Sequence, residues 1–407
     1  MKKYYTIDHR ILFLFGFLFY FLTPYVVGRF NLFAEYPGMQ LFQGYFKEIP
    51  PNKLTYYWII TLSWLPAFYL GHFSFKLAKP YKKALRPFPA NFVSEHISLI
   101  AGLLSALLFV FIIVGRNSIF GGYELYDTGV RGKFSTLLIV FNFFLLYQLL
   151  SEKSRSVILI GGTTLTALLL LSMGGRMYVV QTFIVLLVYK TSFAPNRWKI
   201  SQIIVVLGAA FIVGSAVGLW RMKSSFNLSG ATYSLFAEPV FTWFSTSTFL
   251  SRNEIPLINF PANFLSSFLN LLPNSIFNIK QYVISIKQMG YQYKNPLGAD
   301  SVWTTFIVNF GAFGSFFFIY LTGFLLNFLR HFSEDKRFWA AYYICICGMI
   351  PFQLFRDGFF IINKQLFSNL LLFPALIILL LKLIGYFNMA NHPTVTGSYS
   401  PPVQKPS

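Results

Sequence analysis

Arginine is the residue type in this chain that is best suited to chemistry on an anionic substrate. The residues Gly174-Gly175-Arg176-Met177 join two apolar runs, VILIGGTTLTALLLLSM and MYVVQTFIVLLVY. Two glycines allow a tight reversal of the chain, which fixes Arg176 at the end of two membrane helices. A guanidinium group is always charged and presents a planar set of donors that fits phosphate oxygens. The hinge therefore predicts contact with an anionic, lipid-linked substrate at one membrane face.

Further arginines are predicted at the same face, and we expect at least three arginines to converge on a phosphate-bearing ligand. They are Arg116, Arg131, Arg221, Arg252 and Arg356. Arg176 and Arg221 are the best candidates because each lies at a helix end. For any of these residues the alternative is a side chain that extends into the lipid headgroups. For Arg356 the alternative is a local pair with Asp357.

Two carboxylates on this face are predicted to have different roles, one in catalysis and one in capping a helix. Glu238 lies in an apolar stretch, and desolvation there would raise its pKa and suit it to act as a general base. Its alternative role is a helix-terminal residue before Pro239. Asp300, in NPLGADSVW, is expected to be the N-terminal cap of the helix that follows.

Histidine and cysteine offer little chemistry at this face. The histidines are all predicted on or near the cytoplasmic side, at positions His9, His72, His96, His331 and His392. Cys345 and Cys347 lie inside an apolar run, two residues apart, so neither a disulfide framework nor a zinc site is expected. We therefore predict no metal site and no cofactor.

The composition is that of a membrane protein. Hydrophobic residues make up 55% of the 407 residues and charged residues only 11%, against roughly 25% charged in soluble domains. The net charge of +20 is spread between apolar segments and does not form one basic face, which argues against nucleic acid as a partner. It indicates topogenic charge and contact with membrane lipid.

The elements that must position these residues are about ten transmembrane helices in an all-α polytopic protein. We expect residues 1–220 to hold helices 1–7, residues 221–302 to form a large periplasmic loop, residues 303–387 to hold helices 8–10, and 388–407 to be a disordered cytoplasmic tail. The predicted spans are 11–30, 54–73, 96–115, 134–151, 157–173, 177–190, 201–220, 303–329, 338–355 and 366–387. Roughly twice as many Lys and Arg residues fall on one side as on the other, which predicts both termini in the cytoplasm.

The 221–302 segment is long but is not a polar linker. It contains apolar and aromatic stretches broken by prolines, which predict short amphipathic or re-entrant helices on the membrane face. An additional half-span over 233–250 is the alternative. The small residues between Asn309 and Gly314 predict close helix packing.

Several segments together resemble the bacterial O-antigen polymerases, the oligosaccharide repeat-unit polymerases often called Wzy. They are LLSMGGRMYVVQ at the hinge, GLWRMK before the long loop, LLPNSIF late in it, and GADSVWTTFIVNFGAFG at the next helix. The resemblance implies a GT-C-like fold in the bacterial inner membrane. It also implies an inverting, metal-independent glycosyltransferase that moves a growing glycan from undecaprenyl diphosphate onto another lipid-linked repeat unit.

The resemblance further implies roles for individual residues. Arg176 and Arg221 would bind the donor diphosphate, at the Gly174-Gly175 turn, and Arg131 and Arg252 would support them. Arg356 is a further candidate for substrate binding and Glu238 for the base. Partners implied are undecaprenyl diphosphate-linked oligosaccharide, membrane lipid and a chain-length regulator.

Three other functions fit a multi-span protein of this composition. An O-antigen ligase is similar but usually carries a periplasmic histidine, which is not predicted here. A lipid-linked oligosaccharide flippase should place ionisable residues near mid-membrane and often shows internal repeats. A membrane O-acyltransferase would need a histidine or an equivalent base in or near the membrane.

Overall fold

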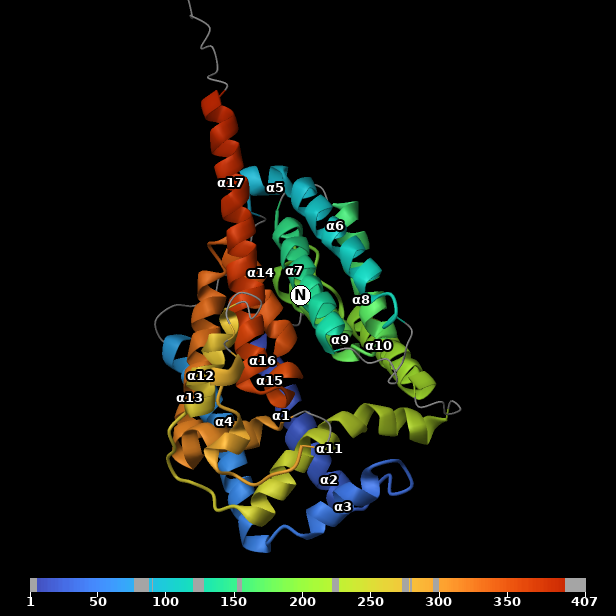
Figure 1. Ribbon diagram of the computed structural model, residues 1–407, viewed down its shortest axis with the longest axis vertical. Helices are drawn as coiled ribbons and strands as arrows, with labels where there is room; N and C mark the ends of the chain where they lie inside the picture. Colours follow the sequence, from blue (N-terminus) through green and yellow to red (C-terminus); the bar gives the residue numbers. More distant parts are fainter. Residues whose placement is uncertain are drawn as a thin grey trace, which may run out of the picture.

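The protein is helical throughout the part that the computed structural model describes. That part comprises residues 6–76, 88–89, 91–119, 128–151, 156–221, 227–272, 278, 280–295 and 300–391. Every regular element within these residues is a helix, apart from an isolated bridge between Phe88 and Ser151. Figure 1 shows an elongated bundle from which α17 (Phe373–Asn391) projects at one end. The predicted all-α fold class is confirmed for these residues.

Among the described residues, six helical segments are long and apolar enough to cross a membrane. They lie in the continuous run of α1 (His9–Phe17), η1 (Leu18–Leu22) and α2 (Thr23–Arg29), in α6 (Ile97–Gly115), α7 (Thr128–Leu149), α10 (Ile200–Arg221) and α13 (Val302–Phe332), and in the run of α16 (Phe359–Asn363), η6 (Lys364–Leu372) and α17. The other four predicted spans coincide with α4 (Pro51–Lys76), α8 (Val157–Ser172), α9 with η2 (Arg176–Val188 and Tyr189–Phe193) and α14 (Arg337–Met349). Ten as the number of spans stays a prediction.

Burial distinguishes a central helix from peripheral ones. In α7, Phe141, Phe143 and Phe144 are inaccessible, and the helix lies between α6 and α8 on one side and α14 on the other (Figure 1). Helices α6 and α10 instead leave large apolar side chains exposed, such as Phe109 and Ile204. An apolar surface of this kind is suited to a lipid environment.

Residues 221–302 contain one long helix where short ones are predicted. Helix α11 (Leu228–Arg252) begins at Asn227, whose side-chain oxygen accepts a hydrogen bond from the Gly230 N–H (2.5 Å). It continues through Pro239 and buries Trp243 against α3 (Met39–Lys47). Over 228–252 the structure thus has one continuous helix in place of short ones; that this helix enters the membrane, as in the alternative of a half-span over 233–250, stays a prediction.

Short elements follow α11. They are α12 (Ala262–Ser267) and the 3-10 turns η3 (Phe268–Leu271), η4 (Lys280–Tyr282) and η5 (Ile286–Met289). At the other end of the chain, α17 continues to Asn391, so the predicted disordered tail is helical where it begins. The remainder of that tail lies outside the described residues.

Helix α13 is broken at Gly311, which has φ +72° and ψ −178°. Beyond the break, the Ala312 N–H donates to the Pro256 carbonyl (2.8 Å) and the Phe313 N–H donates to the Leu257 carbonyl (2.9 Å). A Cβ at position 311 would lie only 2.6 Å from the Leu257 carbonyl oxygen. The small residues here do permit a close approach, but the neighbour is an extended segment and not another helix.

Candidate functional site

The Gly174-Gly175 turn is a helix stop of the Schellman type. Gly174 follows the C-cap of α8 and adopts the left-handed conformation, with φ +80°. The Gly175 N–H donates to the Leu170 carbonyl (2.6 Å) and the Gly174 N–H to the Leu171 carbonyl (3.0 Å), the two bonds that define this motif. The turn makes Arg176 the first residue of α9. The predicted hinge therefore has the tight geometry that its glycines allow.

Arg176 contacts two other helices. Its Nη1 donates to the Ser234 hydroxyl of α11 (3.0 Å), and a Cβ at Gly218 of α10 would lie 2.5 Å from the same nitrogen. Only a glycine leaves room for the guanidinium group at this crossing. Within the described part of the chain Arg176 forms no ion pair, although its charge is near enough to Glu238 to lower the pKa of that carboxyl.

Glu238 lies one helical turn beyond Ser234 on α11 and forms an ion pair with Arg356. Arg356 Nη1 donates to Glu238 Oε1 over 2.8 Å, and both side chains are about a quarter exposed, at 23% and 28%. The Tyr20 hydroxyl donates to the same carboxylate oxygen (3.2 Å). Arg356 ends α15 (Gln353–Arg356). The ion pair thus links two segments that are 118 residues apart in sequence.

Arg131 and Asp357 extend this group of charges. The Arg131 guanidinium lies over the Tyr178 ring, 5.9 Å from its centre. Burial raises the pKa of Asp357 to about 6, although the charges of Arg356 and Arg131 oppose the shift. Arg356 Nε lies 3.9 Å from Asp357 Oδ1. We name the set Arg131, Arg176, Arg356, Glu238 and Asp357 the arginine cluster. The structure thus brings together three of the predicted arginines; that they bind one ligand stays a prediction.

The pKa of Glu238 is shifted in the opposite direction to that expected. Burial alone raises it, but the charges of Arg356 and Arg176 and the hydrogen bond from Tyr20 outweigh burial and lower the pKa below its usual value. The expected raised pKa was wrong because the sequence does not show that Arg356 folds against this acid. Glu238 is held ionised, which suits it to position Arg356 better than to accept a proton.

Three of the predicted arginines are not part of the arginine cluster. Arg116 is exposed at the C-cap of α6. Helix α10 ends at Arg221, one turn beyond Gly218, so the helix end lies beside the arginine cluster; the Arg221 side chain lies outside the described part. Arg252 is exposed at the far end of α11. With 1.5 Å of rise per residue it is about 21 Å along the helix from Glu238. The structure does not bring Arg252 to the cluster.

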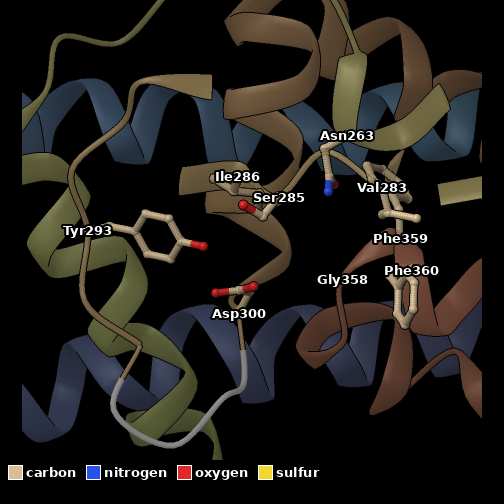
Figure 2. A pocket seen from close by; sticks show the side chains of 9 residues that line it. All are labelled: Asn263, Val283, Ser285, Ile286, Tyr293, Asp300, Gly358, Phe359 and Phe360. Atoms are coloured by element: carbon tan, nitrogen blue, oxygen red, sulfur yellow. The ribbon is translucent and has the colours of Figure 1, made fainter. Parts of the chain in front are cut away.

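Next to the cluster lies a pocket that the sequence analysis did not identify. It has a volume of about 360 Å³ and is lined by Asn263, Val283, Ser285, Ile286, Tyr293, Asp300, Gly358, Phe359 and Phe360. Figure 2 shows the Asp300 carboxylate and the Tyr293 hydroxyl directed toward one another across it. The lining comes from the segment after α11 and from the start of α16. We name this the Asp300 pocket.

Asp300 does not cap α13, contrary to expectation. Ser301 is the cap, and its side chain accepts a hydrogen bond from the Trp303 N–H (3.2 Å). Asp300 Oδ1 instead accepts from Asn295 Nδ2 (2.6 Å). Burial raises the pKa of Asp300 to about 6, although Asn295, Lys287 and Tyr293 oppose the shift; the nearby charge of Asp357 adds to it. One feature of the sequence could have indicated that Asp300 is free for another role: the next residue, Ser301, is itself able to cap the helix.

The described residues of this site include no histidine and no set of metal ligands. None of the described residues of the cluster or the pocket is a histidine; His9 and His72 instead contact each other (3.0 Å). No group of three His, Cys, Asp or Glu side chains among the described residues could hold a metal ion. Comparison of the chain with known protein families, with curated proteins and with solved structures gave no match.

Proposed function

We propose that this protein is a polysaccharide polymerase of the inner membrane, which transfers a growing glycan from undecaprenyl diphosphate onto a lipid-linked repeat unit at the periplasmic face. The observation that carries the proposal is the arginine cluster. Its three guanidinium groups come from α7, α9 and α15, elements distant in the sequence. Convergence of this kind is expected of a site for phosphate oxygens and not of side chains that extend separately into headgroups.

The location of the cluster fits a lipid-linked substrate. Arg131 lies in the first turn of a membrane-crossing helix, Arg176 begins α9, and Asp357 comes two residues before the membrane-crossing segment that starts at Phe359. A lipid diphosphate has its charge at the membrane surface and its hydrocarbon in the bilayer. Arginines at the ends of membrane-crossing helices therefore lie at the depth where the diphosphate of such a lipid is held.

The proposed glycosyl transfer requires two things of the protein: positive charge beside the leaving group and alignment of the acceptor. A sugar diphosphate carries its own leaving group, so the protein must stabilise the charge that develops on the departing diphosphate and hold the acceptor in line. Arg176 is the group best suited to the first task, because no described carboxylate is paired with it. Glu238 and Tyr20 hold Arg356 in place beside it.

The proposed function is tested by deleting the gene in its host and complementing the deletion. Surface glycan from the deletion strain should show core carrying a single repeat unit, and the wild-type chain should restore a ladder of lengths. Arg176→Lys should reach the membrane at normal levels yet fail to restore the ladder, because a point charge does not replace a planar fork of donors.

Arg29→Lys is the matched control. Arg29 is also an arginine at the end of a membrane-crossing helix, but it is exposed, and its variant should restore the full ladder. A normal ladder with Arg176→Lys would contradict the proposed role of the cluster. Loss of every repeat unit in the deletion strain would indicate a flippase or ligase, and an unchanged ladder a modifying enzyme.

A further inference from the structure

We propose that the Asp300 pocket holds the acceptor sugar and that the Asp300 carboxylate accepts the proton of the attacking hydroxyl. This inference rests on the proposed function and deepens it, because it gives the second substrate a site and the reaction a base. Glu238 was the sequence-based candidate for that base, and its ion pair with Arg356 argues against the role.

The pocket has the size and lining of a site for a neutral polar ligand. Its volume of about 360 Å³ is within the range of small-molecule sites, roughly 300–1,000 Å³. Aromatic rings of Tyr293, Phe359 and Phe360 supply apolar surface, against which the C–H faces of a sugar ring can pack. Asn263 and Asp300 supply a few polar groups among them. None of the described lining residues is an arginine or a lysine, so the diphosphate is not the ligand expected here.

Asp300 is oriented for proton transfer within this pocket. Its Oδ1 is held by the Asn295 amide (2.6 Å), while Oδ2 lies on the side of Gly358, 4.0 Å from where a Cβ at that residue would be. The Tyr293 hydroxyl faces the carboxylate from the opposite wall (Figure 2). A hydroxyl of a sugar in the pocket can therefore reach a carboxylate whose orientation is already fixed.

The ionisation of Asp300 suits a base. Burial raises its pKa to about 6, so the carboxylate is ionised at neutral pH yet binds a proton more readily than an ordinary aspartate. A catalytic base is most effective when its pKa is near the working pH. The pKa values of Glu238 and Asp300 are shifted in opposite directions by their surroundings, a pattern that separates an electrostatic group from an acid–base one.

The pocket adjoins the site proposed for the leaving group. Arg356, in the arginine cluster, is two residues before Gly358, in the pocket wall, so the extended chain allows at most about 7 Å between their Cα atoms. Asp357 between them raises the pKa of Asp300 by its charge. A donor diphosphate at the arginines and an acceptor sugar in the pocket would therefore meet at this segment.

The acceptor hydroxyl oxygen attacks the anomeric carbon of the donor glycan and forms the new glycosidic bond. The bond from that carbon to the diphosphate oxygen breaks, and its electron pair leaves with the diphosphate, whose charge the arginines stabilise. The hydroxyl proton passes to Asp300, which releases it to solvent after the product departs.

The experiment measures the transfer rate against pH with the full-length protein in lipid nanodiscs. The substrate is the lipid-linked repeat unit extracted from the host deletion strain. The wild-type rate should fall below about pH 6, approaching tenfold per pH unit, as Asp300 becomes protonated. Asp300→Asn should lose about 10²–10⁴-fold in rate and lose that acidic limb, while its Kd for undecaprenyl diphosphate stays within about twofold of wild type.

Glu254→Gln is the matched control. Glu254 is an exposed acid of the same segment, paired with Lys53 (2.8 Å), and its variant should keep both the rate and the pH profile. Asp300→Glu retains a carboxylate and should recover part of the rate together with the acidic limb. Rates of Asp300→Asn within threefold of wild type, with the limb retained, would overturn the assignment of the base.

Binding of the free glycan separates this inference from the proposed function. The probe is the repeat-unit glycan released from its lipid by mild acid, followed by saturation-transfer NMR. Wild type should bind it, and Tyr293→Ala should bind it at least tenfold more weakly. Glycan binding without any transfer by wild type would contradict the polymerase but keep the sugar pocket. Transfer with an unchanged acceptor KM in Tyr293→Ala would contradict the pocket and keep the polymerase.

Discussion

Glu238 in the arginine cluster and Asp300 in the pocket are both partly buried acids, yet their pKa values are shifted in opposite directions. Burial raises the pKa of each, but around Glu238 the positive charges of Arg356 and Arg176 reverse that effect. Around Asp300 hydrogen bonds and Lys287 oppose burial without overcoming it, and the pKa remains raised at about 6. The difference shows that burial and neighbouring charge together decide which acid can accept a proton; at Asp357, beside Arg356, burial still prevails and the pKa is raised to about 6.

The two regions also differ in what fills them. In the arginine cluster Arg356 and Glu238 form an ion pair of 2.8 Å, and the Tyr20 hydroxyl donates to the same carboxylate. The Asp300 pocket instead leaves about 360 Å³ open between its walls. We infer that the cluster holds charge in a fixed arrangement while the pocket admits a ligand, a division that suits a donor diphosphate and an acceptor sugar.

The largest effect is expected at Arg176. Arg176→Ala should lower the transfer rate by about 10³–10⁵-fold, the loss seen when an arginine that stabilises a phosphoryl transition state is removed. Its Kd for undecaprenyl diphosphate should also rise. The rate is measured with purified protein and lipid-linked repeat units, and Arg29→Ala serves as the control. An Arg176→Ala rate within tenfold of wild type would remove the cluster from the reaction.

The second prediction tests whether Glu238 positions Arg356 or acts as a base. Glu238→Gln leaves Arg356 without its ion pair and should lower the free energy of unfolding by about 1–3 kcal/mol. Adding Arg356→Gln should recover part of that loss, because two neutral side chains no longer leave one buried charge unpaired. Thermal unfolding in detergent gives both numbers. The acidic limb of the rate should persist in Glu238→Gln, and its disappearance would make Glu238 the base.

A smaller effect is expected at the turn that positions Arg176. Gly174 has φ +80°, where any other L-residue is strained, and Gly174→Ala should destabilise the fold by about 1–2 kcal/mol. Gly161 on the same helix α8 has nothing within 4 Å of an added Cβ, and Gly161→Ala should not destabilise. Equal melting temperatures for the two variants would contradict the turn geometry.

The smallest effect concerns stability at Asp300. A raised pKa means that the folded protein binds this proton more tightly than the unfolded chain, so protonation stabilises the fold as the pH falls through about 6. Above that pH the ionised carboxylate opposes folding. Asp300→Asn should therefore have a Tm at pH 8 at or above that of wild type, with the difference shrinking toward pH 4. A lower Tm for the variant at pH 8 would contradict the raised pKa.

The sequence predicted local features better than contacts between distant segments. The Gly174-Gly175 turn is predictable because its hydrogen bonds join residues three and five positions apart. Each predicted span overlaps a helix, although the one over 338–355 is interrupted after Met349. The pKa of Glu238 was not predictable, because its partner Arg356 is 118 residues away. Asp300 was misjudged for a similar reason: its pocket is assembled from Asn263, Ser285 and Gly358, which only the fold brings together.

The most direct test follows the bond that the proposed reaction breaks. Purified wild-type protein in nanodiscs is incubated with lipid-linked repeat units, and both undecaprenyl diphosphate and the glycan are quantified by mass spectrometry. The polymerase reading predicts one undecaprenyl diphosphate released for each new glycosidic bond, in a ladder of lipid-linked oligomers that requires Arg176. Repeat units that remain single on their lipid, with no diphosphate released under conditions where the protein is folded, would contradict it.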